Sequence, residues 1–168
     1  MKKKNKIISY FLIGLLVLLS FFGGSYYEKQ KTKSSPTPVI SPIQNQTVIE
    51  VSDGDTFKLS SDQTFRLYGV NAPEVKEPFF EEAKAFTENL VLGKEISFEQ
   101  EVNYKIDKFG RELGYVFIDG VNLNIELVRN GLAKVVLYEK RAKIKYQDEL
   151  LSAEKEAKAS KLGIWINQ

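Results

Sequence analysis

The sequence predicts an α+β domain in which five principal short strands form a small β-barrel with three helices, preceded by an N-terminal hydrophobic helix. Short, alternating, β-branched segments recur with turn residues between them, which is typical of strands. After the third such segment the apolar residues change to helical spacing, and further strand and helix patterns follow. Five short strands with a helix after the third are typical of the oligonucleotide/oligosaccharide-binding (OB) barrel.

The folded domain is expected to begin at Thr47, where the first alternating segment starts. Apolar residues recur at helical spacing from Phe79 to Leu90, and Gly93 is expected to end this first helix. The expected strands are 47–51, 57–60, 64–70, 95–102 and 113–118, with a shorter one at 132–138, and the later helices are 122–130 and 146–161. A polar loop, 103–111, joins two of the strands.

The first 27 residues predict a signal peptide or a transmembrane anchor. Four lysines precede Ile7–Tyr27, an uncharged and mostly apolar run of 21 residues, long enough to span a bilayer. The lysines are expected to stay in the cytoplasm, so the rest of the chain is exported, either secreted or anchored at the extracellular face of the membrane. A buried helix of a soluble protein is the other interpretation.

Residues 28–46 contain three of the five prolines together with Ser, Thr and Lys, without apolar periodicity. They predict a flexible, extended linker. The expected organisation is therefore a signal or anchor at 1–27, a linker at 28–46 and a single OB-type domain at 47–168.

Composition excludes several kinds of chemistry. The chain has no cysteine and no histidine, so disulfides, Cys/His zinc sites and Ser-His or Cys-His catalysis are excluded. Acid–base chemistry falls to carboxylates, lysines or tyrosines. The first 27 residues hold four lysines and no acid, leaving 20 of the 24 Lys and Arg residues against all 22 Asp and Glu. The positive net charge is therefore no sign of nucleic-acid binding.

The candidate site lies in residues 51–74, where antiparallel strands would bring the two ends of the segment together. Asp53 and Asp55 flank a glycine, Arg66 follows on a strand, and Asn71 and Glu74 flank a proline turn. Oxygen donors suit a hard cation, and a guanidinium suits phosphate oxygens. Each residue also has a plain structural interpretation: an Asx turn, an exposed strand arginine or a surface acid.

A second candidate segment is Asp107-Lys108-Phe109-Gly110-Arg111, where the glycine allows close backbone approach to a ligand. Arg111 is here either a site residue or a solvated loop charge. The most concentrated basic stretch is Lys134, Lys140, Arg141, Lys143 and Lys145. It predicts either phosphate neutralisation or ordinary solvated surface.

Five segments closely resemble the staphylococcal nuclease (thermonuclease) family, in order and at compatible spacing: VSDGDTFKL, TFRLYGVNAPE, DKFGRELGYVF, NLNIELVRNGLAKV and SKLGIW. The resemblance covers residues 47–167, the whole expected domain. It implies an OB barrel with three helices and a Ca²⁺-dependent endonuclease that hydrolyses DNA and RNA without base specificity, leaving 3′-phosphates. A monomer is expected.

The resemblance also implies roles for single residues. The catalytic residues would be Arg66 and Arg111, which stabilise the transition state, and Glu74, the general base. The calcium ligands would be Asp55, Asn71 and the carbonyl of Ala72, with Asp53 behind them. The substrate-binding candidates are Lys108, Phe109, Lys134 and Tyr138.

The chain departs from the family in three places. The family usually has aspartate where this chain has Asn71, so the calcium site loses one formal negative charge. The segment 75–78 is shorter than the lysine-rich loop of well-known members. Tyr138 is one position out of step with the family's base-stacking tyrosines.

Three functions are therefore open: an exported nuclease, a catalytically weak or inactive nucleic-acid-binding module at the cell surface, and a structural surface protein that binds proteins or glycans. The nuclease is favoured because Arg66, Glu74 and Arg111 are all present.

Overall fold

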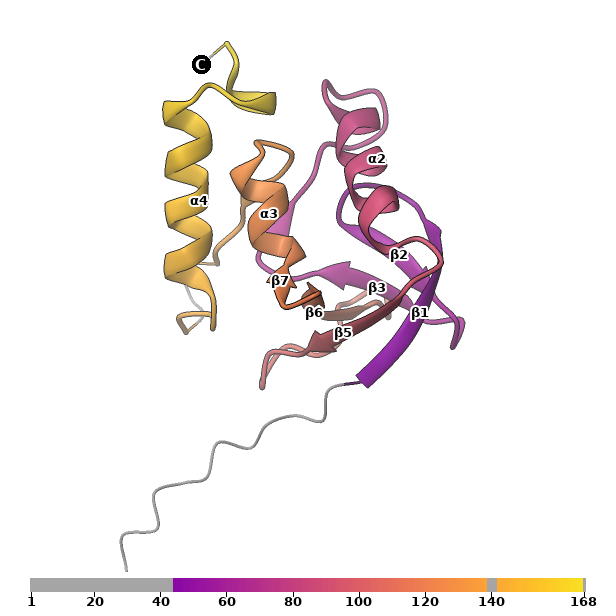
Figure 1. Cartoon of the computed structure of the whole chain (residues 1–168). Helices are drawn as coiled ribbons and strands as arrows, with labels where there is room; N and C mark the ends of the chain where they lie inside the picture. Colours follow the sequence, from indigo (N-terminus) through magenta and orange to yellow (C-terminus); the bar gives the residue numbers. More distant parts are fainter. Residues whose placement is uncertain (1–43, 139–141, 168) are drawn as a thin grey trace, which may run out of the picture. The chain divides into compact units, whose positions relative to one another are not determined.

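The computed structural model describes residues 44–138 and 142–167 (Figure 1). The expected signal or anchor helix at 1–27 and most of the expected linker lie outside these residues. Within the described ranges, no helix has both the length and the apolar character needed to cross a membrane.

The described elements agree closely with the expected order. The strands are β1 (Gln44–Val51), β2 (Thr56–Leu59), β3 (Thr64–Leu67), β4 (Val70–Asn71), β5 (Glu95–Glu99), β6 (Glu112–Ile118), β7 (Val121–Asn122) and β8 (Lys134–Val135). The helices are α2 (Phe80–Val91), α3 (Leu123–Arg129) and α4 (Gln147–Ala159), followed by a 3₁₀ turn, η1 (Gly163–Trp165).

Five strands close into the expected barrel. The antiparallel pairs are β1–β2, β2–β3, β1–β5 and β5–β6, and the parallel pairing of β3 with β6 completes the closure. β1 serves two sides of the barrel: its first half pairs with β5 and its second half with β2, with a register irregularity between Val48 and Glu50. Such an irregularity bends a strand.

This double role of β1 corrects the expected start of the domain. Gln44 to Gln46 were expected to belong to the linker, but they pair with β5, so the strand begins at Gln44 rather than Thr47. Their polar side chains give no strand signal. The pairing with β5 satisfies backbone hydrogen-bonding groups that the sequence pattern cannot reveal.

The barrel core is built from the inward-facing residues of the alternating strands. Phe57, Phe65 and Phe98 are buried, with the Phe57 and Phe65 rings stacked at 5.4 Å and the Phe98 ring edge-on to Phe65 at 4.8 Å. Gly114 on β6 lets the barrel close, because a Cβ there would lie 2.6 Å from the Glu99 carbonyl and 2.8 Å from the Phe65 ring.

The helices pack on the barrel through specific polar contacts as well as apolar ones. Asn124 on α3 is buried, and its side chain donates to the carbonyls of Tyr68 (2.9 Å) and Gly114 (3.2 Å) and accepts from the Val116 amide (3.2 Å). One side chain thus joins α3 to both β6 and the residue after β3. α4 lies alongside α3 (Figure 1).

Besides the strand expected at 95–102, which ends at Glu99, two further expected strands are shorter in the structure. The segment expected at 64–70 ends as a strand at Leu67, because Gly69 adopts a left-handed conformation (φ 78°) and turns the chain into β4. The segment expected at 132–138 is a strand only over β8, whose partner β4 is itself two residues long. Both differences lie beside the candidate site.

Candidate active site

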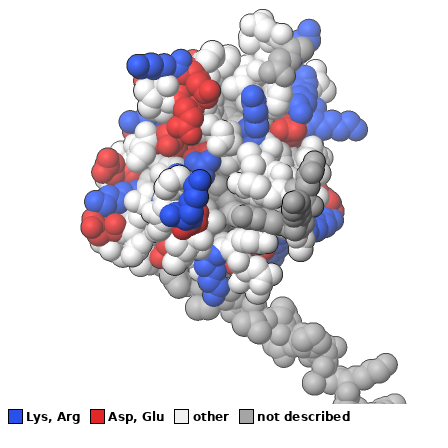
Figure 2. Space-filling model, turned by 180° about the vertical axis from the view of Figure 1, so that it is seen from behind, with Lys and Arg blue, Asp and Glu red and all other residues white. Residues whose placement is uncertain are grey.

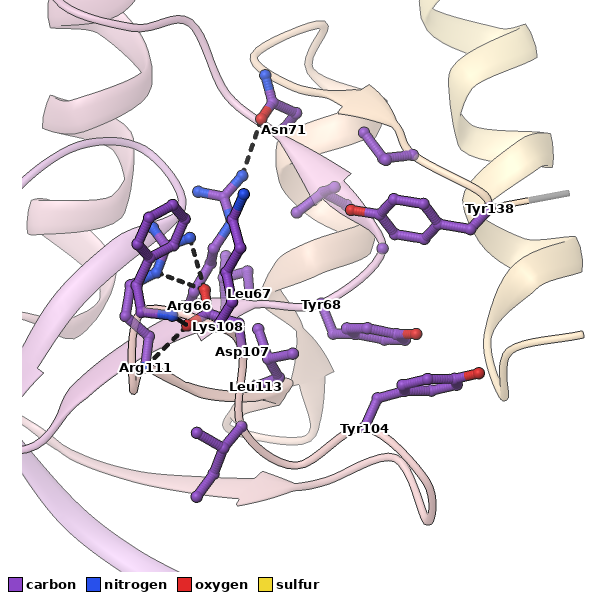
Figure 3. A pocket seen from close by; sticks show the side chains of 15 residues that line it. Arg66, Leu67, Tyr68, Asn71, Tyr104, Asp107, Lys108, Arg111, Leu113 and Tyr138 are labelled. Atoms are coloured by element: carbon purple, nitrogen blue, oxygen red, sulfur yellow. Dashed lines mark hydrogen bonds and ion pairs between the residues drawn. The ribbon is translucent and has the colours of Figure 1, made fainter. Parts of the chain in front are cut away.

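Arg66 on β3 lies on the opposite face from its neighbours, as its alternation with Phe65 and Leu67 predicted. Those two side chains are buried, whereas the Arg66 side chain is 17% exposed and reaches two acceptors at once. Nη1 forms an ion pair with Oδ1 of Asp55. Nη2 donates to Oδ1 of Asn71 at 2.8 Å, and Figure 3 shows this second bond. The guanidinium therefore lies between two of the predicted calcium-binding oxygens.

Asp55 is held in place from several sides and is only 2% exposed. Besides the ion pair, Oδ1 accepts from Thr56 Oγ1 at 2.9 Å, and Oδ2 accepts from the Ala72 amide at 2.8 Å. Burial raises the pKa of Asp55 to about 7, and Asp53 acts in the same direction, while the Arg66 guanidinium and the two hydrogen bonds oppose the rise.

The turn before β2 is packed tightly against α2. A Cβ on Gly54 would lie 2.8 Å from the Cβ atoms of both Ala72 and Ala83, and Thr87 Oγ1 donates to the Gly54 carbonyl at 2.6 Å. Asp53 Oδ1 accepts from the Asp55 amide at 2.9 Å, so Asp53 shapes the turn behind the site, in agreement with both interpretations of its role. α2 thereby fixes the position of Asp55.

Arg66 and Arg111 line the same cavity, which has a volume of about 430 Å³ (Figure 3). The parallel register of β3 and β6 explains this, because Arg66 lies opposite Leu113, two residues after Arg111. The cavity therefore joins two cationic side chains from segments that are distant in the sequence, and it has an apolar wall that includes Leu67, Leu113 and Val136.

Asp107 orients Arg111. Its Oδ2 accepts from Nε and lies 2.7 Å from Nη2 of Arg111, and its Oδ1 accepts from the backbone amides of Phe109 (2.8 Å) and Arg111 (3.0 Å). Burial acts to raise the pKa of Asp107, but these hydrogen bonds and the guanidinium outweigh it and hold the pKa below its usual value. The guanidinium of Arg111 is held by one carboxylate, so its remaining N–H groups are available to a ligand.

Glu74 lies outside the arginine cavity. Glu74 is exposed and is not among the residues that line the cavity. Its backbone amide donates to Oε2 of Glu77 at 2.8 Å. It follows Ala72 by two residues, a span of at most about 7 Å of extended chain. The amide of Ala72 donates to Asp55, so the Glu74 backbone is only two residues along the chain from the predicted calcium ligands.

The oxygens of this site suit a hard cation. Asp55, Asn71 and Ala72 provide a carboxylate, an amide oxygen and a carbonyl, and hydrogen bonds connect them directly or through Arg66. Oδ2 of Asp55 accepts only the Ala72 amide among the described residues and so keeps a lone pair. No group of three or more Asp, Glu, His or Cys side chains within 44–138 and 142–167 is placed to hold a metal. The donors fit a Ca²⁺ ion that keeps several waters.

The predicted substrate-binding residues lie in two different pockets of the structure. Lys108, Phe109 and Tyr138 line the arginine cavity. Lys134 does not: it lines a separate pocket of about 380 Å³ with Asn71 and Ala72, and its Nζ lies 5.9 Å from the centre of the Trp165 ring.

Two of the described lysines in the basic stretch are paired with acids. Lys143 pairs with Asp148 and Lys145 with Glu99, while Lys140 and Arg141 lie outside the described residues. Figure 2 shows acidic and basic side chains interspersed on the face that it presents. For the two described pairs, the structure favours the interpretation as ordinary surface.

Sequence reasoning gave no role to four residues that shape the site: Thr56, Tyr68, Tyr104 and Asp107. Tyr68 is two residues beyond Arg66, and this spacing signals a shared face in a strand. Asp107 stands four residues before Arg111, a spacing that could have suggested their ion pair. Tyr104 lies in a polar loop and has no such signal.

A closed barrel with two oriented guanidinium groups beside an oxygen-lined site defines a class of protein suited to binding phosphate esters. Comparison with known proteins is more specific. The model of the family described as "Staphylococcal nuclease homologue" matches residues 64–167. Thermonuclease of Staphylococcus hyicus is 35% identical, and the match covers 74% of this chain and 77% of that protein. The chain belongs to the staphylococcal nuclease family.

Two relatives from Bacillus subtilis (strain 168) are also similar. Endonuclease YncB is 29% identical, with the match covering 96% of this chain and 92% of that protein. SPbeta prophage-derived endonuclease YokF is 34% identical over 71% of this chain, but the match spans 43% of that protein's length.

Proposed function

We propose that this chain is a Ca²⁺-dependent nuclease that hydrolyses phosphodiester bonds of DNA and RNA and leaves 3′-phosphates. The observation that carries the proposal is that Arg66 and Arg111 line one cavity and that a carboxylate orients each of them. Family membership and the endonuclease and thermonuclease names of the relatives support it.

The two guanidinium groups bind the scissile phosphate and stabilise the charge that develops in the transition state. Negative charge accumulates on the phosphoryl oxygens and on the leaving 5′-oxygen, and donors fixed in advance stabilise it without reorganisation. Arg66 and Arg111 are both fixed in this way, by Asp55 with Asn71 and by Asp107. Removal of one such donor typically costs about 10²–10³ in rate.

Asp55, Asn71 and the carbonyl of Ala72 would hold the metal. A Ca²⁺ ion bound there would supply a Lewis acid to the phosphate. Asp55 is the one carboxylate of this ligand set, so affinity is modest. An exported enzyme works where calcium is abundant, and export is what the basic head and apolar run of residues 1–27 predict.

Glu74 is the general base. It takes the proton from the attacking water as the new P–O bond forms. The bond from phosphorus to the 5′-oxygen breaks, and the 5′-oxygen leaves as an alkoxide that the guanidinium groups stabilise and that solvent water protonates. Its exposed position two residues after Ala72 leaves its carboxylate room to reach the attacking water. No histidine is present to do this work.

The substrate is bound through its backbone. Lys108 and the arginines contact phosphates, which carry no base information, so cleavage lacks base specificity. The phosphates are the same in DNA and RNA, so both are accepted. The enzyme acts as a monomer at the extracellular face, secreted or held by residues 1–27.

A nucleic-acid-binding module without strong catalysis is the alternative, and the position of Glu74 outside the arginine cavity favours it. Plasmid digestion separates the two functions. The nuclease predicts cleavage in Ca²⁺ that stops in EGTA and in Glu74→Gln, but continues in Glu82→Gln, a matched change of an exposed acid on α2. DNA binding without cleavage in Ca²⁺ would establish the module instead.

A further inference from the structure

The arginine cavity has two chemically different sides. Figure 3 shows Arg66 and Arg111 toward one side and the rings of Tyr68, Tyr104 and Tyr138 toward the other. A nucleotide has the same two-part character, a phosphate and a flat aromatic base. The volume of about 430 Å³ lies within the roughly 300–1,000 Å³ typical of small-ligand sites.

Tyr104 is fixed in the cavity wall by an aromatic contact. Its ring stacks on that of Tyr68 with a centroid distance of 6.0 Å and an interplanar angle of 16°. Tyr68 is 5% exposed and is itself held edge-on against Tyr115 at 6.0 Å, so it forms a rigid support. Tyr104 is only partly buried and presents aromatic surface to the cavity.

The backbone sets the distance between Tyr104 and the cationic side of the cavity. The amide of Leu113 donates to the carbonyl of Lys105 at 2.8 Å, and the amide of Asp107 donates to the carbonyl of Arg111 at 3.0 Å. These two hydrogen bonds hold the loop that contains Tyr104 against the start of β6, which directly follows Arg111. The aromatic ring and the guanidinium are therefore parts of one ordered unit.

We propose that Tyr104, supported by Tyr68, is a nucleobase-stacking residue for the nucleotide whose phosphate lies between Arg66 and Arg111. The inference rests on the proposed nuclease function and adds a base contact from the loop before β6. It is separate from Tyr138, which comes from the segment after β8. Because every base has a π-face, stacking is compatible with cleavage that lacks base specificity.

Binding of two single-stranded probes by the full-length protein in EGTA tests the inference. One probe is fluorescein-labelled hexathymidylate, and the other is an abasic hexamer with the same sugar-phosphate backbone. Tyr104→Ala should weaken binding of hexathymidylate at least about fivefold and leave binding of the abasic hexamer unchanged. Tyr104→Phe should restore tight binding, because the ring is kept.

The salt dependence provides a second readout. Tyr104→Ala should not change the slope of log affinity against log salt concentration, since that slope counts phosphate contacts, whereas Lys108→Ala should reduce it. Val102→Ala is the matched control: it lies in the same loop, is 78% exposed and does not line the cavity, so both probes should bind as before. Thermal melting of each variant checks that it is folded.

The outcomes separate this inference from the proposed function. If the wild-type protein binds hexathymidylate and cleaves DNA in Ca²⁺, but a folded Tyr104→Ala protein binds hexathymidylate normally or weakens equally for both probes, the stacking inference is wrong and the nuclease stands. If the wild-type protein neither binds nor cleaves, both are wrong.

Discussion

Arg66 lies opposite Leu113 in the parallel pairing of β3 and β6, and this register brings Arg111 to the cavity that Arg66 lines. Side chains of a strand alternate between its two faces, so a shift of one residue would turn Arg66 or Leu113 to the other face. Gly114, next in β6, allows the close approach that this pairing requires. The two arginines can therefore line one cavity only when β3 and β6 pair and the barrel is closed.

Asp107→Asn should reduce stability through Arg111. The amide keeps an oxygen for the backbone donors but loses the charge that holds the guanidinium, at a cost of about 1–2 kcal/mol in the free energy of unfolding. The folded-state pKa of Asp107 lies below its ordinary value of 3.8, so its contribution is complete above that pH and is lost as the pH falls through the folded-state pKa.

Urea unfolding of wild type and Asp107→Asn at several pH values measures this effect. The difference in free energy of unfolding should be constant above the ordinary pKa of 3.8 and shrink as the pH falls further below it. A difference that grows with acidification would mean that the carboxylate is not stabilised in its charged form.

Gly54→Ala should destabilise the turn that positions Asp55. The new Cβ would lie 2.8 Å from the Cβ atoms of Ala72 and Ala83, so α2 or the turn must move, at a cost of about 1–3 kcal/mol. Differential scanning calorimetry should show a lower melting temperature than for Ser52→Ala, an exposed control on the same loop. Equal melting temperatures would show that α2 does not constrain the turn.

Asn71→Asp should lower the Ca²⁺ concentration needed for half-maximal cleavage. A second carboxylate beside Asp55 adds negative charge to the site, and this outweighs the loss of the 3.3 Å bond from Asn71 Nδ2 to the Ala72 carbonyl. Asn89→Asp adds the same charge at an exposed position on α2 and should not change the requirement. If Asn71→Asp leaves the requirement unchanged or raises it, Asn71 is no ligand.

Local patterns predicted most of the secondary structure but not how the barrel closes. Helical spacing predicted α2, and Gly93, with φ 72°, follows its C-cap as expected. The parallel contact of β3 with β6 joins segments that local spacing cannot connect. The start of β1 was missed because Gln44 to Gln46 are polar and become a strand only by pairing with β5.

The site shows the same limit. Asp55, Arg66 and Asn71 lie in one continuous segment, and the structure brings them together as its antiparallel strands suggested. Arg111 and Tyr104 reach the cavity through tertiary pairing, and family resemblance pointed only to Arg111. Lys143 and Lys145 belong to a basic stretch of the sequence, but each forms an ion pair with an acidic side chain. The partner of Lys145 lies on β5, far away in the sequence.

The central claim is that Arg66 and Arg111 act on one phosphate. Single-turnover cleavage of a short DNA at saturating Ca²⁺ tests it with Arg66→Lys, Arg111→Lys and the double variant. Arg129→Lys, whose ion pairs lie on α3 and α4, is the control.

Each single variant should lose about 10²–10³ in rate, and the double variant should lose less than the product of the two, because the side chains share one transition state. Wild-type rates in either single variant, or losses that multiply independently, would contradict the claim.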